Sequence, residues 1–250
     1  MRWLLPFVFF ALPAWAESVV LGLSQNEIAI TTSFDGSEIL VFGAVKRDVP
    51  VPDGPELEVI VTVAGPSVPV MVRRKDKRFG IWVNTDAVEV DEAPSFYAIA
   101  TSGLLNEVLS DTDDLRYKIS VPRAIRSVGA PMSISDASQF TDALIRIRES
   151  TRLYQLQENH VVVDEQTLFR GRIELPAALT EGAYVTRIFL TREGKVISTY
   201  ETTIDVHKVG LERWLFGLSR EQPFLYGLMS LAIAISAGWG ASAAFSLLRR

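Results

Sequence analysis

The sequence predicts a mainly β protein: immunoglobulin-like sandwich lobes with a bridging α-helix, followed by a juxtamembrane helix and one C-terminal transmembrane helix. Three observations support this fold class. Apolar residues alternate with polar ones over residues 18–103 and again over residues 161–206, a period of two that is typical of half-buried strands. Between these regions, apolar residues recur at the spacing of three or four residues that is typical of a helix. Residues 224–248 carry no charged side chain, as expected for a membrane span.

Residues 1–16 have the features of a cleaved signal peptide. Arg2 provides a positive first region, residues 3–12 an apolar core, and Ala14 and Ala16 a small-residue cleavage site. The alternative is an uncleaved membrane anchor. It is disfavoured because a run this short, interrupted by prolines, cannot cross about 30 Å of hydrocarbon. The mature chain is expected to begin at Glu17.

Residues 17–127 are predicted to form an N-terminal β-sandwich domain. Turn signals such as Asp35-Gly36 and Gly65-Pro66 separate its alternating runs. The chain has no cysteine, so the immunoglobulin-like outline depends on the number and spacing of strands alone. The alternating runs are residues 19–23, 28–30, 39–45, 57–63, 68–72, 79–83 and 96–100.

Residues 128–159 are predicted to be a helical segment that packs on the sheets, and a shorter helical stretch is expected at residues 104–109. Ser135 is the expected N-cap of the main helix. One face of that helix is expected to carry Phe140, Leu144, Ile147, Thr151 and Tyr154.

Residues 160–207 alternate again and are predicted to form a second β-rich lobe. Its last two strands are expected to join in a hairpin in which Gly194 adopts a positive φ. The pattern leaves open whether the two β-rich parts are one domain or two.

Residues 208–222 are predicted to form a juxtamembrane amphipathic helix. Its apolar side chains recur at helical spacing, which favours a helix on the outer leaflet of the membrane. The alternative is a helix packed under the globular domain. The apolar positions are Leu211, Trp214, Leu215 and Leu218.

Residues 223–248 are predicted to form the transmembrane helix. As a helix, residues 224–248 would be about 37 Å long, enough to cross the bilayer with some tilt. Cations flank both sides, so a count of positive charges alone would place the C-terminus outside. A long domain behind a signal peptide is translocated largely regardless of its charges. We therefore expect a periplasmic N-terminal domain and a cytoplasmic end at residues 249–250.

The absence of cysteine and of Asn-x-Ser/Thr acceptor sites favours a bacterial extracytoplasmic protein over a eukaryotic secreted one. Together with the span, this predicts a single-pass protein of the bacterial inner membrane.

Small residues recur every four positions inside the predicted span. Four-residue spacing places them along one helix face, where they allow another helix to approach closely. The expected helix-packing face consists of Ser230, Ala234, Gly238 and Ser242. Its partner could be a second copy of the chain or another membrane protein.

A strongly basic run stands out in a chain whose net charge is −5. It could bind an acidic partner or phosphate head groups. The more common role of such a run is an exposed turn that keeps a hairpin soluble. The run comprises Arg73, Arg74, Lys75, Lys77 and Arg78, and is expected to lie between two strands.

No motif predicts catalysis, a metal site or a cofactor. His160 and His207 lie at predicted strand ends and lack the further ligands that zinc requires. The acidic cluster of Asp111, Asp113 and Asp114 lacks the spacing of a calcium loop and suggests a helix cap or a solvated loop. The acidic net charge disfavours nucleic acid binding. We expect the protein not to be an enzyme.

Four segments resemble a family of single-pass transmembrane proteins from alphaproteobacteria. They are TSFDGSEILVFGAV, RFGIWVN, EAPSFYAIA and EQPFLYGLMSLAIAISAGW. The resemblance covers nearly the whole mature chain and carries over no catalytic or binding residue. The resemblance also implies a gene located near those of sulfite-exporter-type permeases, and with it a membrane-protein partner, of which a transporter is one candidate.

These observations predict an anchored periplasmic module that is an accessory or scaffolding subunit of another membrane protein. The small-residue face would provide the contact within the bilayer. The alternative is an anchored module that binds an envelope ligand by itself.

Overall fold

The computed structural model describes residues 18–24, 27–30, 34–47, 54–127, 136–208 and 211–248. The expected signal peptide with Ala14 and Ala16, the expected N-cap Ser135 and the expected cytoplasmic end lie outside these residues. The chain divides into two compact units. The first comprises Met1–Asn26 with Asp35–Asp205, and the second comprises Glu27–Phe34 with Val206–Arg250.

The first sheet has four antiparallel strands in the order β1-β3-β10-β9. They are β1 (Ser18–Leu23), β3 (Ser37–Lys46), β10 (Leu168–Leu175) and β9 (Val161–Asp164). Burial alternates along β3 and β10, so that Ile39, Val41 and Ile173 are buried while their neighbours point outward. This alternation places one face of the sheet on the core and leaves the other open to solvent.

The second sheet has six strands in the order β2-β12-β11-β4-β7-β8. They are β2 (Glu27–Ile30), β12 (Lys195–Lys208), β11 (Gly182–Arg192), β4 (Glu58–Ala64), β7 (Tyr97–Thr101) and β8 (Tyr154–Gln157). The central strands β4 and β7 are buried along nearly their whole length. Both faces of a strand must be covered to produce such a pattern.

The two sheets pack on each other, and helices cover the far face of the second sheet. Contacts between β4 and β9 and between β7 and β10 join the sheets. On the far face, Ile60, Ile99 and Phe189 pack with side chains from the helical segments, including Leu109, Ile119 and Leu144. The mainly β fold predicted from the sequence is confirmed.

The strands expected in two lobes share both sheets. β3 pairs with β10 from Ser37–Leu175 to Ala44–Leu168, and β4 pairs with β11. Within the first unit, the expected division into residues 17–127 and 160–207 therefore does not separate two hydrophobic cores. Each half of the chain supplies the hydrogen-bonding partners that the other half lacks.

Between β7 and β8, the described residues form the helices α1 (Leu105–Val108), α2 (Asp111–Tyr117), α3 (Val121–Ala124) and α4 (Ala137–Ser150). The acidic cluster of Asp111, Asp113 and Asp114 lies in the first turn of α2, whose N-cap is Ser110, so it is neither a solvated loop nor the N-cap of this helix. Ser110 Oγ accepts from the Asp113 amide at 3.3 Å, and the Asp114 carboxylate accepts from Ser120 N–H at 2.7 Å. These bonds satisfy backbone donors that a helix end and its turn leave free.

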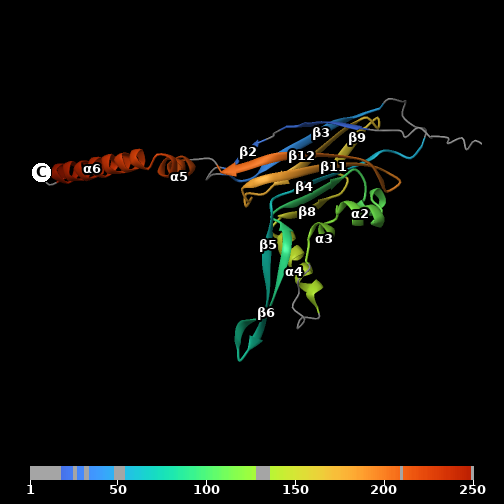
Figure 1. Cartoon of the computed structure of the whole chain (residues 1–250), viewed down its shortest axis with the longest axis horizontal. Helices are drawn as coiled ribbons and strands as arrows, with labels where there is room; N and C mark the ends of the chain where they lie inside the picture. Colours follow the sequence, from blue (N-terminus) through green and yellow to red (C-terminus); the bar gives the residue numbers. More distant parts are fainter. Residues whose placement is uncertain are drawn as a thin grey trace, which may run out of the picture. The chain divides into compact units, whose positions relative to one another are not determined.

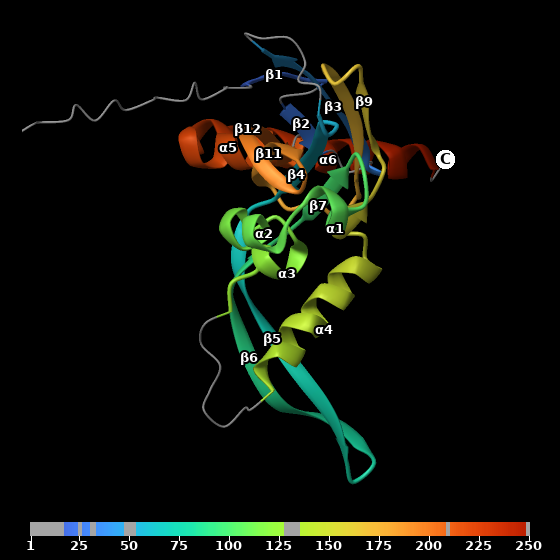
Figure 2. The same cartoon turned by 90° about the vertical axis from the view of Figure 1, so that its right-hand side faces the viewer.

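Strands β5 (Ser67–Arg78) and β6 (Ile81–Pro94) form a separate two-stranded sheet. Figure 1 shows this hairpin directed away from β3, β9 and β11. Helix α4 contacts both strands of the hairpin, and in Figure 2 the tip of the hairpin extends beyond α4. Phe140 and Leu144, both from the predicted apolar face of this helix, are buried, whereas Ile147 is exposed.

The second unit contains α5 (Leu211–Glu221) and α6 (Pro223–Leu248), which contact each other. Within α6, residues Pro223–Ser242 have a mean hydropathy of 1.5 and are not buried. Among the described helices, this one is long and apolar enough to cross a membrane. Both predicted C-terminal helices are therefore present at nearly their expected bounds.

Candidate interaction surfaces

The basic run lies inside β5, not between two strands as expected. The turn of the hairpin is formed instead by Phe79 and Gly80, whose φ angles are 51° and 87°. Positive φ at both central residues is the geometry of a type I′ turn, which matches the twist of the flanking strands. The five cations therefore point alternately to the two faces of a strand.

Arg74 differs from the other cations because it joins the hairpin to α4. Its guanidinium lies 2.5 Å from Asp136 Oδ2 and 3.8 Å from Asp86 Oδ2. It also lies 4.6 Å from the centre of the Phe140 ring. Arg74 therefore has a structural role, and the candidate basic surface reduces to Arg73, Lys75, Lys77 and Arg78, of which Arg78 lies 3.6 Å from Asp76.

The tip of the hairpin exposes three large apolar side chains. Relative exposures are 106% for Phe79, 65% for Ile81 and 68% for Trp82. Burying such side chains is ordinarily favourable, so this tip is an unusual place for them on a protein surface. The sequence pattern assigned these residues to a half-buried strand and did not identify the tip as a surface.

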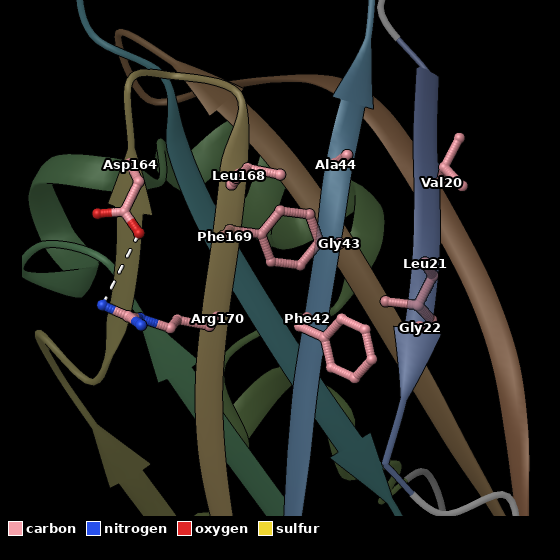
Figure 3. A pocket seen from close by; sticks show the side chains of 10 residues that line it. All are labelled: Val20, Leu21, Gly22, Phe42, Gly43, Ala44, Asp164, Leu168, Phe169 and Arg170. Atoms are coloured by element: carbon pink, nitrogen blue, oxygen red, sulfur yellow. Dashed lines mark ion pairs between the residues drawn. The ribbon is translucent and has the colours of Figure 1, made fainter.

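A second surface lies on the outer face of the first sheet. Here β1, β3, β9 and β10 line a groove of about 480 Å³. Figure 3 shows the Phe42 ring directed toward Gly22 of the neighbouring strand. A Cβ at Gly22 would lie 2.4 Å from that ring, so the glycine provides the space that the ring occupies. The floor of the groove includes the exposed Val20, Phe42 and Leu168.

Ion pairs lie along the same outer face. Arg170 is 3.8 Å from Asp164, and Arg172 is 3.5 Å from Glu38. All four side chains are more than half exposed, so each pair contributes little to stability. The groove has an apolar floor beside paired charges, and the alternating pattern of the sequence did not indicate it.

The titratable groups with shifted pKa values in the described part of the chain are three tyrosines. Burial raises the pKa of Tyr97 and of Tyr184, and raises the pKa of Tyr154 to about 12. Each hydroxyl donates to a backbone carbonyl at 2.8 Å: Tyr97 to Ile119, Tyr154 to Pro94 and Tyr184 to Thr180. These bonds make the tyrosines structural members of the core.

The two histidines lie at strand ends, as predicted. His160 Nδ1 is 2.9 Å from the Glu158 carbonyl. His207 Nδ1 is 3.9 Å from a Glu27 carboxylate oxygen, a proximity across strands that the sequence did not indicate.

Ser230, Ala234, Gly238 and Ser242 all lie on α6 and are exposed. A Cβ built at Gly238 meets no atom within 4 Å. Gly227 belongs to the same face, because seven residues before Ala234 is two helical turns. It was missed because a strict four-residue repeat does not include it.

In the described part of the chain, a mainly β fold precedes one apolar helix long enough to cross a membrane, the architecture of a membrane-anchored protein. Residues 18–247 match the family described as "Putative transmembrane protein (Alph_Pro_TM)". The match covers nearly the whole chain, and the protein belongs to this family. A search of curated proteins found no match.

Proposed function

We propose that the protein is a membrane-anchored, non-catalytic periplasmic module that acts as an accessory or scaffolding subunit of another membrane protein. The observation that carries the proposal is the exposed small-residue face of α6, which contains Gly227, Ser230, Ala234, Gly238 and Ser242. A transporter is the class of partner that the family resemblance implies.

The chemistry of this face favours a helical partner. In a bilayer, apolar side chains gain nothing from leaving lipid, so helices associate through close packing and hydrogen bonds between backbones and small polar side chains. Open space at Gly238 allows such an approach, and the hydroxyls of Ser230 and Ser242 could form hydrogen bonds across the interface.

A non-catalytic role is supported by the titratable groups. Catalytic acids and bases have pKa values shifted toward working pH. Tyr97, Tyr154 and Tyr184 have pKa values shifted upward by burial, and their hydroxyls donate to backbone carbonyls. The signal-peptide features of residues 1–16 support the periplasmic location.

The groove on the first sheet favours the second candidate function, an anchored module that binds an envelope ligand by itself. Its volume of about 480 Å³ is in the range of small-molecule sites. Its apolar floor, with Arg170 and Asp164 on the lining, fits an apolar ligand with a polar or charged group.

Gly238→Leu separates the two functions. The leucine side chain fills the space that a partner helix would need, so we expect the recovery of a co-purifying membrane protein to fall about tenfold or more. The measurement is affinity purification of the full chain from membranes in mild detergent, followed by quantitative mass spectrometry.

Gly240→Leu is the matched control. It makes the same change about 160° around the helix from Gly238, and a Cβ there also meets no atom within 4 Å. Partner recovery should stay at the wild-type level. Equal recovery with both variants, together with a bound ligand on a monomeric chain, would favour the ligand-binding function instead.

A further inference from the structure

The hairpin tip combines exposed aromatic side chains with cations and goes beyond the proposed contact of α6. We propose that the β5–β6 tip binds the interface of the anionic phospholipid bilayer that anchors the chain. The apolar residues Phe79, Ile81 and Trp82 would enter the boundary between head groups and acyl chains. Lys75 and Lys77 would contact lipid phosphates.

The strand register determines which side chains share a face. Lys77 is directly opposite Trp82, and Lys75 is opposite Asn84. Residues opposite each other and two apart point to the same side of a hairpin. One face of the tip therefore carries Trp82 with two lysines and no carboxylate.

The other face of the tip is electrically more balanced. Arg78 is opposite Ile81, and Asp76 is opposite Val83. Arg78 lies 3.6 Å from Asp76, so its charge is partly compensated. The Trp82 face is the side with uncompensated positive charge, which complements an anionic surface.

The shape of the tip favours lipid over a folded protein partner. Three protruding side chains present on the order of 500 Å², whereas a stable protein interface needs about 800 Å² on each partner. A bilayer interface accepts a protrusion without a complementary pocket, and tryptophan is enriched at that depth. Residues at the turn can keep their backbone groups hydrated there, because the head-group region contains water.

The root of the hairpin is fixed while the tip is free to insert. Arg74 joins the root to α4 through Asp136, and the strand register shifts between Arg74 and Lys75. The tip of the hairpin extends beyond α4 (Figure 2). Anchoring through α6 raises the effective concentration of the bilayer, so a weak contact suffices. Each lysine near an anionic surface strengthens binding about fivefold.

The test uses the natural absence of cysteine. Ile81→Cys places one label on the face opposite Trp82, and the labelled full chain is reconstituted in nanodiscs with a nitroxide quencher on the lipid acyl chains. With 30% phosphatidylglycerol we expect nitroxide quenching of the label at least threefold stronger than in pure phosphatidylcholine. Salt at 0.5 M should remove most of the difference, because it screens the lysines.

Two variants identify the residues responsible. Lys75→Glu with Lys77→Glu should reduce quenching to the phosphatidylcholine level, and Trp82→Ala should reduce it at least threefold. Lys195→Glu, an exposed charge reversal elsewhere, should change nothing. All the substituted side chains are exposed, so we expect each variant to fold. Circular dichroism of each variant checks this.

Two results would overturn the proposal. In one, the label is open to aqueous iodide and insensitive to the lipid nitroxide in both nanodiscs. In the other, it is shielded only in native membranes, where it crosslinks to a protein. The nanodisc result does not depend on α6 binding a partner, because the nanodiscs contain no other protein, so it tests the tip separately from the proposed function.

Discussion

Tyr154 illustrates how a single buried side chain links stability to pH. Only 3% of the residue is exposed, and its hydroxyl donates to the Pro94 carbonyl at 2.8 Å. Burial raises the pKa of Tyr154 from 10.0 to about 12. The folded state therefore favours the neutral phenol, so this contribution is complete below pH 10 and is lost as the pH rises from 10 to about 12.

Tyr154→Phe tests this linkage. At pH 8 the free energy of unfolding of the variant should be about 1–2 kcal/mol lower than that of the wild type, because the Pro94 carbonyl loses its hydrogen-bond donor. Between pH 10 and 12 its stability should fall less steeply than that of the wild type. Thermal unfolding of the full chain in detergent, followed by circular dichroism from pH 8 to 12, measures both effects.

Tyr200→Phe is the control, since Tyr200 is 37% exposed. It should unfold with the wild-type pH dependence. An unchanged slope for Tyr154→Phe would show that other groups cause the alkaline loss of stability.

At the residue scale, the sequence predicted the burial of strand residues more reliably than the structural role of the exposed residues. Ile39, Val41 and Val45 are buried as their period of two predicted. The same period assigned Phe79 to a strand. The turn was hidden because a bulky residue rarely adopts positive φ, so Gly80 alone indicated it.

At the scale of elements, the contact between α4 and the β5–β6 hairpin depends on Arg74. We expect Arg74→Ala to destabilise this contact by about 1 kcal/mol, since the residue forms part-exposed ion pairs and covers the Phe140 ring. Amide hydrogen exchange should become faster in the first turn of α4 and around residues 72–75. Mass spectrometry of the exchanged full chain measures this directly.

Arg73→Ala is the matched control for this element. Arg73 is exposed and points to the opposite face of β5, so exchange in α4 should remain at the wild-type rate. Equal acceleration in both variants would mean that strand propensity, and not the Arg74 contact, determines the stability of the hairpin root.

The elements themselves could largely be predicted, but the bounds of the helical segment before β8 and the groove on the first sheet could not. Residues 128–159 were expected to be helical, and the described helix comprises Ala137–Ser150. The small-residue face of α6 was predicted because helical spacing is local information. The groove was not, because Val20, Phe42 and Leu168 meet only through strand pairing between distant segments.

At the scale of the whole molecule, sheet order is what the sequence could not provide. β3 lies between β1 and β10, and β11 lies between β12 and β4. Many pairings of similar alternating strands bury the same side chains, so periodicity does not select among them. The prediction of two lobes assumed that strands close in sequence pair with each other. In the structure, β3 pairs with β10 and β4 pairs with β11, which are distant in sequence.

The orientation of the molecule in the membrane is testable with single cysteines in the cysteine-free chain. Glu174→Cys on the exposed face of β10 should react with a membrane-impermeant maleimide in intact spheroplasts. Arg250→Cys should react only after lysis. The reverse pattern of labelling would place the β domain in the cytoplasm and contradict the proposed periplasmic location.

The interleaved strand order determines when the domain can be assembled. β3 is complete at Lys46, but its neighbour β10 begins at Leu168, and β12 ends at Lys208, shortly before the anchor helices. At ribosomal rates of 5–20 residues per second, the first strands wait on the order of ten seconds for their partners. Until then the edge of β3 that pairs with β10 has no partner. Translation that stops before β12 leaves the second sheet without one of its strands.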